Sequence, residues 1–456
     1  MNLTRTVYLP IELKAREFDS KLLLALELLR RDYMVVFGQQ WAIYDHLAEL
    51  PPGIILFKSH NAIHHPNVVK ARDRGFYTMA LEEEVMSLGS QKAMGKIDSK
   101  GLYDVVDRVL VHGEFELNYH LSQGCPPRKL AVVGNPRIDL LRPPNLRSAV
   151  SESLAKRDRY GDFILVNTNF GIKNSIWSVE QLIDIAIRSG AINRKDPDSI
   201  RDFVEFAEWE RACDLMLKEV LKIFTERSPD VKVIVRPHPS ESIEKVMHSF
   251  EGLKNIQIVK EGGVIPWILA SHCLVHSSCT TGLESAIVGK PTVGLIPYQN
   301  YYSEQILSNK VCRTFQSVES AAQELTEIVS NEARQDRVED LSEPSFSELS
   351  FYIANVRGDK STSRIADLID DIDCSLKHAD FVGFPPSHQH EILAEKCSFT
   401  ADEMVGKIHS LASHEMGLGF AFDVHEFTAS LYLLAPRSPT KFSSCSNFPE
   451  SAEEIS

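Results

Sequence analysis

The chain has 456 residues, of which 43% are hydrophobic and 25% are charged, a composition typical of globular proteins. Its 49 basic and 63 acidic residues give a net charge of −14, and no Lys/Arg-rich block stands out, which argues against nucleic-acid binding as the main activity. The eight cysteines are scattered without a CxxC pair, so we expect neither a disulfide framework nor a thiolate zinc site. Because no apolar run reaches spanning length, we expect a cytoplasmic protein, with peripheral association at the inner face of a membrane left open.

The first 140 residues alternate apolar runs with helical patterns, as parallel α/β domains do. Amphipathic patterns predict helices at 17–31, 67–74 and 114–121. The apolar runs between them predict strands at 6–9, 34–38, 53–57, 76–80, 108–111 and 130–133.

A polar stretch from Arg142 to Asp162 is the predicted connection between two domains. The α/β pattern then restarts, and its apolar runs predict strands at 163–167, 232–235, 255–259 and 273–275, with another from Thr292. Helices are predicted at 203–227, after Glu241, at 265–270, before Gly289, at 318–330 and at 361–372. The predicted domains are residues 1–150 and 151–340, followed by a helical segment at 341–434, partly packed back on the domains, and a disordered tail at 435–456.

Two strand ends in the second half carry polar turns. Residues 276–285, HSSCTTGLES, follow one strand and open a helix, where backbone N–H groups and the helix dipole suit an anion. A capping box, with Thr281 at the N-cap and Glu284 at N3, is the competing interpretation. The other strand ends in the sequence RPHP, whose prolines fix the backbone around a guanidinium and an imidazole that suit a phosphate. The predicted nucleotide and phosphate ligands are Arg236, His238, Pro239, Ser277, Ser278, Thr280, Thr281 and Glu284.

Further polar residues follow other predicted strands. Three successive carboxylates, Glu82–Glu84, repel anions but suit a general base or a nucleophile, although acidic residues are also common in the first turn of a helix. The candidate catalytic residues are Glu83, Glu12 and Glu82, and the remaining candidates are Arg16, Lys58, His60, Asn169 and Lys173.

No metal site is predicted. His60 and His64 have the spacing of a helical metal pair, but Pro66 is close and no third ligand is evident. Neither Asp371–Asp373 nor Asp196–Asp198 clearly follows a strand, so we discount both as DxD metal motifs. We expect no cofactor, since the nucleotide-sugar would be the substrate.

Five segments together resemble the bacterial surface carbohydrate biosynthesis protein family. They are VYLPIELKAREFDSKLLLALELL near the start, VVDRVLVHGEFELNYHLSQ with KLAVVGNPRIDLL, FILVNTNFG, RPHPSE and HSSCTTGLESAIVGKPTVGL. This family looks like a GT-B type glycosyltransferase group, with more distant similarity to capsule polysaccharide transferases, CDP-glycerol glycerophosphotransferases and the UDP-GlcNAc 2-epimerase fold. The resemblance covers residues 5–372.

The resemblance implies two Rossmann-like domains with parallel sheets facing across a cleft, and a nucleotide held mainly by the C-terminal domain. His238 and Pro239 match the His–Pro pair of bacterial transferases that use CMP-activated acidic sugars. Ser277, Ser278 and Thr280 match the hydroxyl-rich turn at the phosphate, and Glu284 falls where many GT-B enzymes hold a ribose. The family pattern at residues 82–85 is Asp–Glu–Glu–Gly, from which this chain departs with Glu82 and Val85.

We therefore expect a metal-independent glycosyltransferase that moves a sugar, in our reading a CMP-linked acidic one, from a nucleotide donor to a surface polysaccharide or a lipid-linked precursor. Arg236, His238 and the 277–281 turn would neutralise the leaving phosphate. Glu83 or Glu12 would take the acceptor proton or attack the sugar. The alternatives are a nucleotide-sugar 2-epimerase, a CDP-alditol phosphotransferase and a non-catalytic scaffold of glycan assembly.

Overall fold

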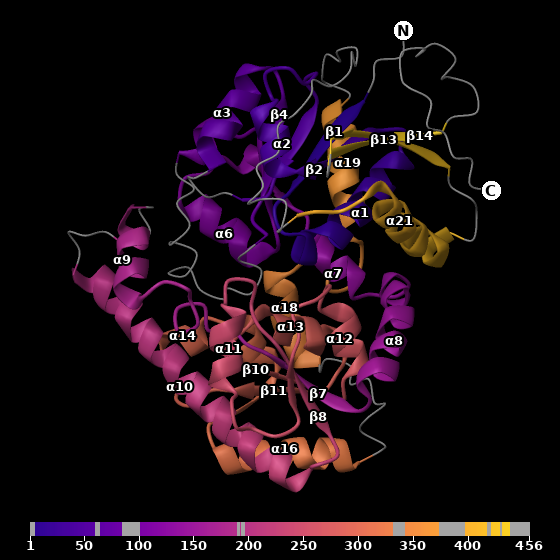
Figure 1. Ribbon diagram of the computed structural model, residues 1–456. Helices are drawn as coiled ribbons and strands as arrows, with labels where there is room; N and C mark the ends of the chain where they lie inside the picture. Colours follow the sequence, from indigo (N-terminus) through magenta and orange to yellow (C-terminus); the bar gives the residue numbers. More distant parts are fainter. Residues whose placement is uncertain are drawn as a thin grey trace.

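The computed structural model describes residues 5–59, 64–83, 101–188, 192, 197–331, 343–373, 397–416, 421–428 and 431–437. It contains two α/β domains, which form the upper and lower halves of Figure 1. Each domain is built on a sheet with parallel strands, so the α/β fold class with two Rossmann-like domains is confirmed.

The N-terminal domain is built on an eight-stranded sheet in the order β13-β14-β2-β1-β3-β4-β5-β6. Its parallel strands are β1 (Thr6–Ile11), β2 (Met34–Gln39), β3 (Ile54–Phe57), β4 (Tyr77–Leu81), β5 (Arg108–Val111) and β6 (Leu130–Val132). The connections contain α1 (Lys14–Leu29), α2 (Gln40–Asp45), α3 (His65–Asp73), α5 (Leu102–Val105), α6 (Glu114–Ser122), η2 (Pro127–Lys129) and α7 (Pro136–Leu140).

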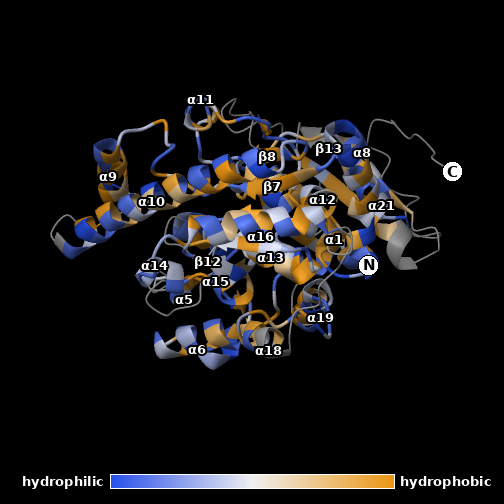
Figure 2. Cartoon of the chain, turned by 90° about the horizontal axis from the view of Figure 1, so that it is seen from below, coloured by the Kyte–Doolittle hydropathy of each residue, from blue (hydrophilic) through white to orange (hydrophobic). Residues whose placement is uncertain are grey.

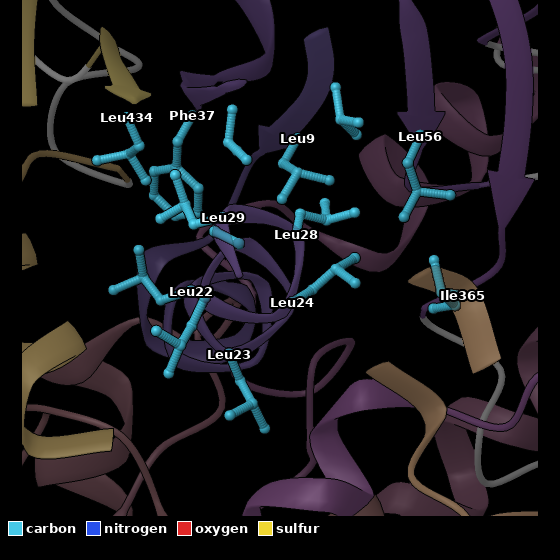
Figure 3. Packing of buried hydrophobic residues seen from close by; sticks show 14 of the residues in the cluster. Leu9, Leu22, Leu23, Leu24, Leu28, Leu29, Phe37, Leu56, Ile365 and Leu434 are labelled. Atoms are coloured by element: carbon cyan, nitrogen blue, oxygen red, sulfur yellow. The ribbon is translucent and has the colours of Figure 1, made fainter. Parts of the chain in front are cut away.

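Helix α1 forms the centre of the N-terminal core. Its leucines, including Leu22, Leu24 and Leu28, are fully buried against β1, β2 and β3 (Figure 3). Burying each leucine stabilises the fold by about 1.5–3 kcal/mol. The same core contains Ile365 and Leu434 from the C-terminal part of the chain, so residues far apart in sequence complete this domain.

The C-terminal domain is built on a six-stranded sheet in the order β12-β11-β10-β7-β8-β9. Its parallel strands are β7 (Phe163–Asn167), β8 (Lys232–Arg236), β9 (Ile256–Ile258), β10 (Leu274–His276), β11 (Thr292–Leu295) and β12 (Arg313–Phe315). The linker from the first domain contains η3 (Asn145–Ala149) and α8 (Val150–Tyr160). The helices of the C-terminal domain are α9 (Val179–Arg188), α10 (Pro197–Arg227), α11 (Ile243–Ser249), α12 (Ile265–Ala270), α13 (Thr280–Val288), α14 (Tyr301–Glu304), α15 (Leu307–Val311) and α16 (Val318–Ser330).

Helices α10 and α16 pack side by side over this sheet. Each is hydrophobic along part of its surface and hydrophilic along the rest (Figure 2). Leu217, Val220 and Phe224 of α10 and Leu325 of α16 meet the buried strands β7 and β8 in one cluster. The predicted end of α13 is confirmed, because Gly289 is the C-cap and has the left-handed φ of 81° that glycine adopts easily.

The C-terminal segment corrects one expectation. Residues 341–434 were predicted to be helical, and α18 (Glu343–Tyr352), α19 (Ser361–Asp373) and α21 (Ala401–Met416) are helices. However, β13 (Phe422–Thr428) and β14 (Leu431–Pro436) form an antiparallel hairpin that extends the N-terminal sheet beyond β2. Both faces of β14 are buried, with Leu431 and Leu433 in one cluster and Tyr432 and Leu434 in another. Because a short apolar run of this kind shows no period, the sequence pattern does not distinguish a strand from a buried helix here.

The tail predicted to be disordered from residue 435 begins inside β14, while residues 438–456 lie outside the described part of the chain.

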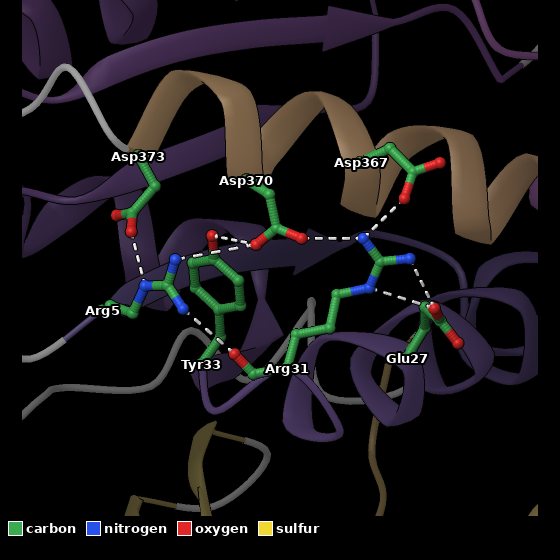
Figure 4. A network of polar contacts seen from close by, with 7 residues as sticks. All are labelled: Arg5, Glu27, Arg31, Tyr33, Asp367, Asp370 and Asp373. Atoms are coloured by element: carbon green, nitrogen blue, oxygen red, sulfur yellow. Dashed lines mark hydrogen bonds and ion pairs between the residues drawn. The ribbon is translucent and has the colours of Figure 1, made fainter.

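Helix α19 is fixed to the N-terminal domain by a polar network (Figure 4). Arg5 pairs with Asp373, Arg31 with Asp367 and Asp370, and the Tyr33 hydroxyl donates to Asp370. The partly exposed ion pairs contribute little individually, so this network mainly fixes where α19 lies. None of the described helices has both the length and the apolar character required to cross a bilayer.

Candidate functional site

The C-terminal sheet has a topological switch point between β7 and β10, where the strand order changes direction. Ligands of doubly wound α/β folds bind outside the carboxyl ends of the strands at such a point. His276 of β10 pairs in register with Asn167 of β7, which pairs with Arg236 of β8. The three strands therefore end in one row, and the predicted ligand-binding turns start from neighbouring positions about 4.8 Å apart.

The turn after β10 has an unusual backbone. Ser278 lies at φ 57°, a left-handed conformation that costs a non-glycine residue about 1 kcal/mol or more and recurs at functional sites. The Asn309 amide of α15 donates to the Ser278 hydroxyl at 2.7 Å. Ser277 is 4% exposed, and its hydroxyl has no hydrogen-bond partner among the described residues. The turn thus presents a buried polar atom that a ligand would satisfy.

The predicted capping box at the start of α13 is wrong. The N-cap is Cys279, which makes no side-chain capping bond, and the helix begins at Thr280, so Thr281 lies inside its first turn. The Thr281 hydroxyl contacts the Cys279 sulfur at 2.5 Å. Glu284 pairs instead with Arg137 of the N-terminal domain at 2.5 Å, since a bond between two charged groups is stronger than one to a neutral backbone amide.

His276 packs beneath the first turn of α13. A Cβ atom on Gly282 would lie only 2.5 Å from the imidazole Nε2, so this close approach requires glycine. Burial lowers the pKa of His276 to about 4, so the ring is neutral at pH 7 and acts as a packing group below the turn.

The turns after β7 and β8 are joined by Glu241, which is 2% exposed. Its carboxylate accepts hydrogen bonds from the Thr168 hydroxyl (2.8 Å), the Asn174 amide (2.7 Å) and the backbone N–H groups of Phe170 and His238 (3.2 and 3.1 Å). Glu241 was not among the predicted ligand-binding residues, although it stands three positions after His238 in the RPHPSE motif. Asn169 completes the link to the third turn by donating to the Ser278 carbonyl at 3.5 Å.

Arg236 and His238 point to different surroundings. The Arg236 guanidinium donates to the carbonyls of Glu261 (3.0 Å) and Gly262 (2.6 Å) and lies over the Trp267 ring. Burial lowers the pKa of Arg236 to about 10, although the negative charges of Glu261, Glu152 and Glu284 raise it in part. His238 is exposed, and its Nδ1 accepts from the Ser240 backbone N–H at 3.2 Å, which places the ring proton on Nε2.

Two of the predicted residues serve the local structure. The Pro239 carbonyl accepts a hydrogen bond from Lys260 at 3.1 Å. Lys173 pairs with Asp214 of α10 at 2.8 Å and donates to Ser249 at 2.9 Å, so its charge is directed toward α10 and α11.

The N-terminal sheet has its own switch point, between β1 and β3. Lys58, which follows β3, pairs with Glu12, which follows β1, and the Ser59 hydroxyl donates to Glu82 after β4. Lys58 and Glu82 are buried, whereas the Glu12 side chain is 28% exposed. The predicted carboxylates therefore lie at the carboxyl edge of this sheet, where a ligand of such a fold would bind.

Glu83 and Glu17 extend this charged cluster inward. Glu83 pairs with Lys21 of α1 at 2.7 Å, and Glu17 accepts from the Glu12 backbone N–H at 2.7 Å and pairs with Arg16 at 3.0 Å. Burial, together with the charge of Glu83, raises the pKa of Glu17. Lys21 could have been found in the sequence, because a lysine one helical turn after Glu17, at the start of the apolar run LLLAL, signals a buried partner.

Contacts between the domains bring the two edges together. An added Cβ atom on Gly263, which follows β9, would lie 3.9 Å from the Ala15 carbonyl after β1, and Ile265 packs against the N-terminal core. With the Arg137–Glu284 pair, these contacts place the start of α1 and helix α7 against the C-terminal domain.

Some predictions concern positions without a described structure. His60 and Glu84 lie outside the described residues. Within the described ranges, no group of three or more His, Cys, Asp or Glu side chains is arranged to hold a metal ion.

No protein-family model and no curated protein matches the sequence. Solved structures similar to this chain include a UDP-N-acetylglucosamine 2-epimerase from Listeria monocytogenes (14% identity, TM-score 0.49, 84% of this chain and 100% of that one) and S. aureus MnaA with UDP (12%, 0.48, 84% and 100%). A third is the wall teichoic acid polymerase TagF (12%, 0.48, 82% and 90%).

Proposed function

We propose that this chain is a glycosyltransferase that transfers a sugar from a nucleotide-sugar to a hydroxyl of a glycan acceptor. One observation carries the proposal: polar clusters predicted from the sequence lie at the switch points of both sheets. These are the 276–281 turn beside Asn169 at β7/β10 and the Glu12–Lys58 pair at β1/β3. A group-transfer enzyme needs one site for the donor and one for the acceptor, and each switch point is the ligand position of its sheet.

The donor phosphate would bind at the start of α13. The helix dipole and the N–H groups of the first turn attract an anion, and the buried Ser277 hydroxyl donates to it. The exposed His238, held by the Glu241 network, supplies a second donor from the neighbouring turn. These groups stabilise the charge that develops on the leaving phosphate.

The acceptor would bind at the carboxyl edge of the N-terminal sheet. The acceptor oxygen attacks the anomeric carbon, the bond from that carbon to the phosphate oxygen breaks, and the nucleotide leaves with the electron pair. Glu12 takes the acceptor proton, because its carboxylate is partly exposed beside Lys58 at this edge of the sheet. Glu83 is buried and pairs with Lys21, and this buried ion pair helps to hold the segment after β4 in place.

The donor we propose is a CMP-linked acidic sugar and the acceptor a cell-surface polysaccharide or its precursor, as the family resemblance implies. The test uses purified protein with a panel of CMP-, UDP-, GDP- and CDP-activated donors. Binding is followed by calorimetry, and product formation by mass spectrometry, with donor hydrolysis as a readout that needs no acceptor. One donor class should bind, turn over slowly alone and turn over faster with a glycan acceptor.

Variants locate the activity in the structure. Ser277→Ala and His238→Ala should each weaken donor binding about tenfold, the loss of one hydrogen bond to a charged group. Arg201→Ala, on the exposed surface of α10, is the matched control and should bind as wild type does. Unchanged affinity in both site variants would remove the donor-site assignment. Conversion of UDP-GlcNAc to its 2-epimer without an acceptor would replace the transferase by an epimerase.

A further inference from the structure

The ion pair between Arg137 and Glu284 joins the two domains at the proposed donor site. Arg137 lies on α7, which follows β6, and Glu284 lies on α13, the helix that begins at the proposed phosphate turn. The guanidinium Nη2 is 2.5 Å from the Glu284 Oε1, and the two side chains are 12% and 3% exposed. An ion pair this buried requires further hydrogen bonds to offset the loss of hydration.

The second Glu284 oxygen lacks such a bond. Oε2 is buried and has no hydrogen-bond partner among the described residues, and the same holds for the Nε–H of Arg236. The charge of Glu284 is among those that oppose the lowering of the Arg236 pKa by burial. Oε2 is an acceptor and the Nε–H group a donor, and a hydroxyl of a bound ligand can satisfy either kind of group.

Arg137 is held rigidly. The Asn135 side chain caps α7 by accepting the Arg137 backbone N–H at 2.9 Å. Asp139, on the same helix, accepts the N–H groups of Ser361 and Thr362 at 3.0 and 2.8 Å and thereby fixes α7 to the start of α19. A guanidinium on so constrained a helix restricts the orientation of the carboxylate with which it pairs.

We propose that Arg137 is a positioning residue of the donor site: from the N-terminal domain it orients Glu284 so that the second carboxylate oxygen accepts a hydrogen bond from a hydroxyl of the bound nucleotide-sugar. This inference rests on the proposed function and adds a contribution from the opposite domain. The hydroxyl belongs either to the ribose or to the transferred sugar, and the experiment separates the two.

The experiment compares dissociation constants by calorimetry for the nucleotide, its 2′-deoxy and 3′-deoxy forms, and the full donor. In wild type, removal of the recognised ribose hydroxyl should weaken binding at least about tenfold. In Arg137→Met that ratio should fall to within about twofold, and Arg137→Lys should keep an intermediate ratio. Arg142→Met is the matched control, because Arg142 follows the same helix and, within the described part of the chain, donates to the 355–358 segment and not to Glu284. It should keep the wild-type ratio.

Each result supports or overturns the proposal. The hydroxyl is on the transferred sugar if two results are found together. The deoxyribose nucleotides bind wild type as tightly as the ribose nucleotide does, and the full donor binds wild type at least about tenfold more tightly than the nucleotide, a gain that Arg137→Met loses. If Arg137→Met keeps every wild-type ratio, the proposal is wrong although the proposed function stands. If no nucleotide binds to wild type, the proposed function fails as well. Should Arg137→Met not fold, Glu284→Ala must lose the same discrimination.

Discussion

The Nζ atom of Lys21 lies 2.7 Å from Oε1 of Glu83, and their side chains are only 2% and 4% exposed. Lys21 comes from α1 and Glu83 from the segment after β4, so the pair fixes the predicted acidic segment to the central helix of the N-terminal domain. A carboxylate this deeply buried needs such a charged partner to offset its lost hydration.

We predict that Lys21→Met lowers the free energy of unfolding by about 3–5 kcal/mol, because it leaves the buried Glu83 carboxylate without its partner. The double variant Lys21→Met/Glu83→Gln should recover much of that loss. Urea titration measures both values. Arg201→Ala removes an exposed ion pair as a control and should change the free energy by no more than about 1 kcal/mol. Additive effects of the two buried substitutions would contradict the coupling.

We predict that Gly282→Ala destabilises the C-terminal domain by about 1–3 kcal/mol, since the new Cβ would lie 2.5 Å from the His276 Nε2 and force α13 away from β10. Gly406→Ala is the matched control in α21, where an added Cβ meets nothing within 4 Å. It should stabilise by about 0.5–1 kcal/mol through helix propensity. Thermal unfolding of the two variants should thus shift in opposite directions, and equal shifts would show that the His276 contact is unimportant.

His276 should make stability depend on pH. Burial lowers its folded-state pKa from 6.5 to about 4, so below pH 6.5 the unfolded chain binds a proton that the folded chain does not. The contribution of His276 is therefore complete above pH 6.5 and falls by about 1.4 kcal/mol per pH unit as the pH drops toward 4. His276→Gln should lack this part of the slope when unfolding free energies are compared between about pH 7.5 and about pH 4.5. Parallel curves for the two proteins would refute the assignment.

Glu241 should connect nucleotide binding to the folding of two turns. We predict that Glu241→Ala lowers stability by about 2–4 kcal/mol and abolishes measurable nucleotide binding, because Thr168, Phe170, Asn174 and His238 all lose their acceptor. Thr168→Val removes one of these bonds and should cost about 1 kcal/mol with nucleotide binding retained. Calorimetry with the best-binding nucleotide checks both variants. Wild-type affinity in Glu241→Ala would show that the turns do not require this carboxylate.

Local patterns in the sequence were sufficient to predict the strands that end at the candidate site. The apolar run before His276 and the stop at Gly289 defined β10 and α13 within a few residues. Pairings between distant residues could not be predicted in this way. Arg137 and Glu284 are 147 positions apart, and their contact depends on how the domains dock. The same limit applies to β14, whose pairing with β2 joins opposite ends of the chain.

The last prediction concerns Ser278, whose left-handed backbone at φ 57° is part of the turn where we propose that the phosphate binds. Ser278→Gly and Ser278→Ala both remove the hydroxyl that Asn309 contacts, but only alanine keeps the steric cost of that conformation. The glycine variant should therefore be more stable than the alanine variant by about 1 kcal/mol in urea titration. If the turn geometry forms the phosphate site, glycine should also retain tighter nucleotide binding than alanine. The opposite order in both measurements would mean that the Ser278 conformation carries no strain and that the turn is not built for the ligand.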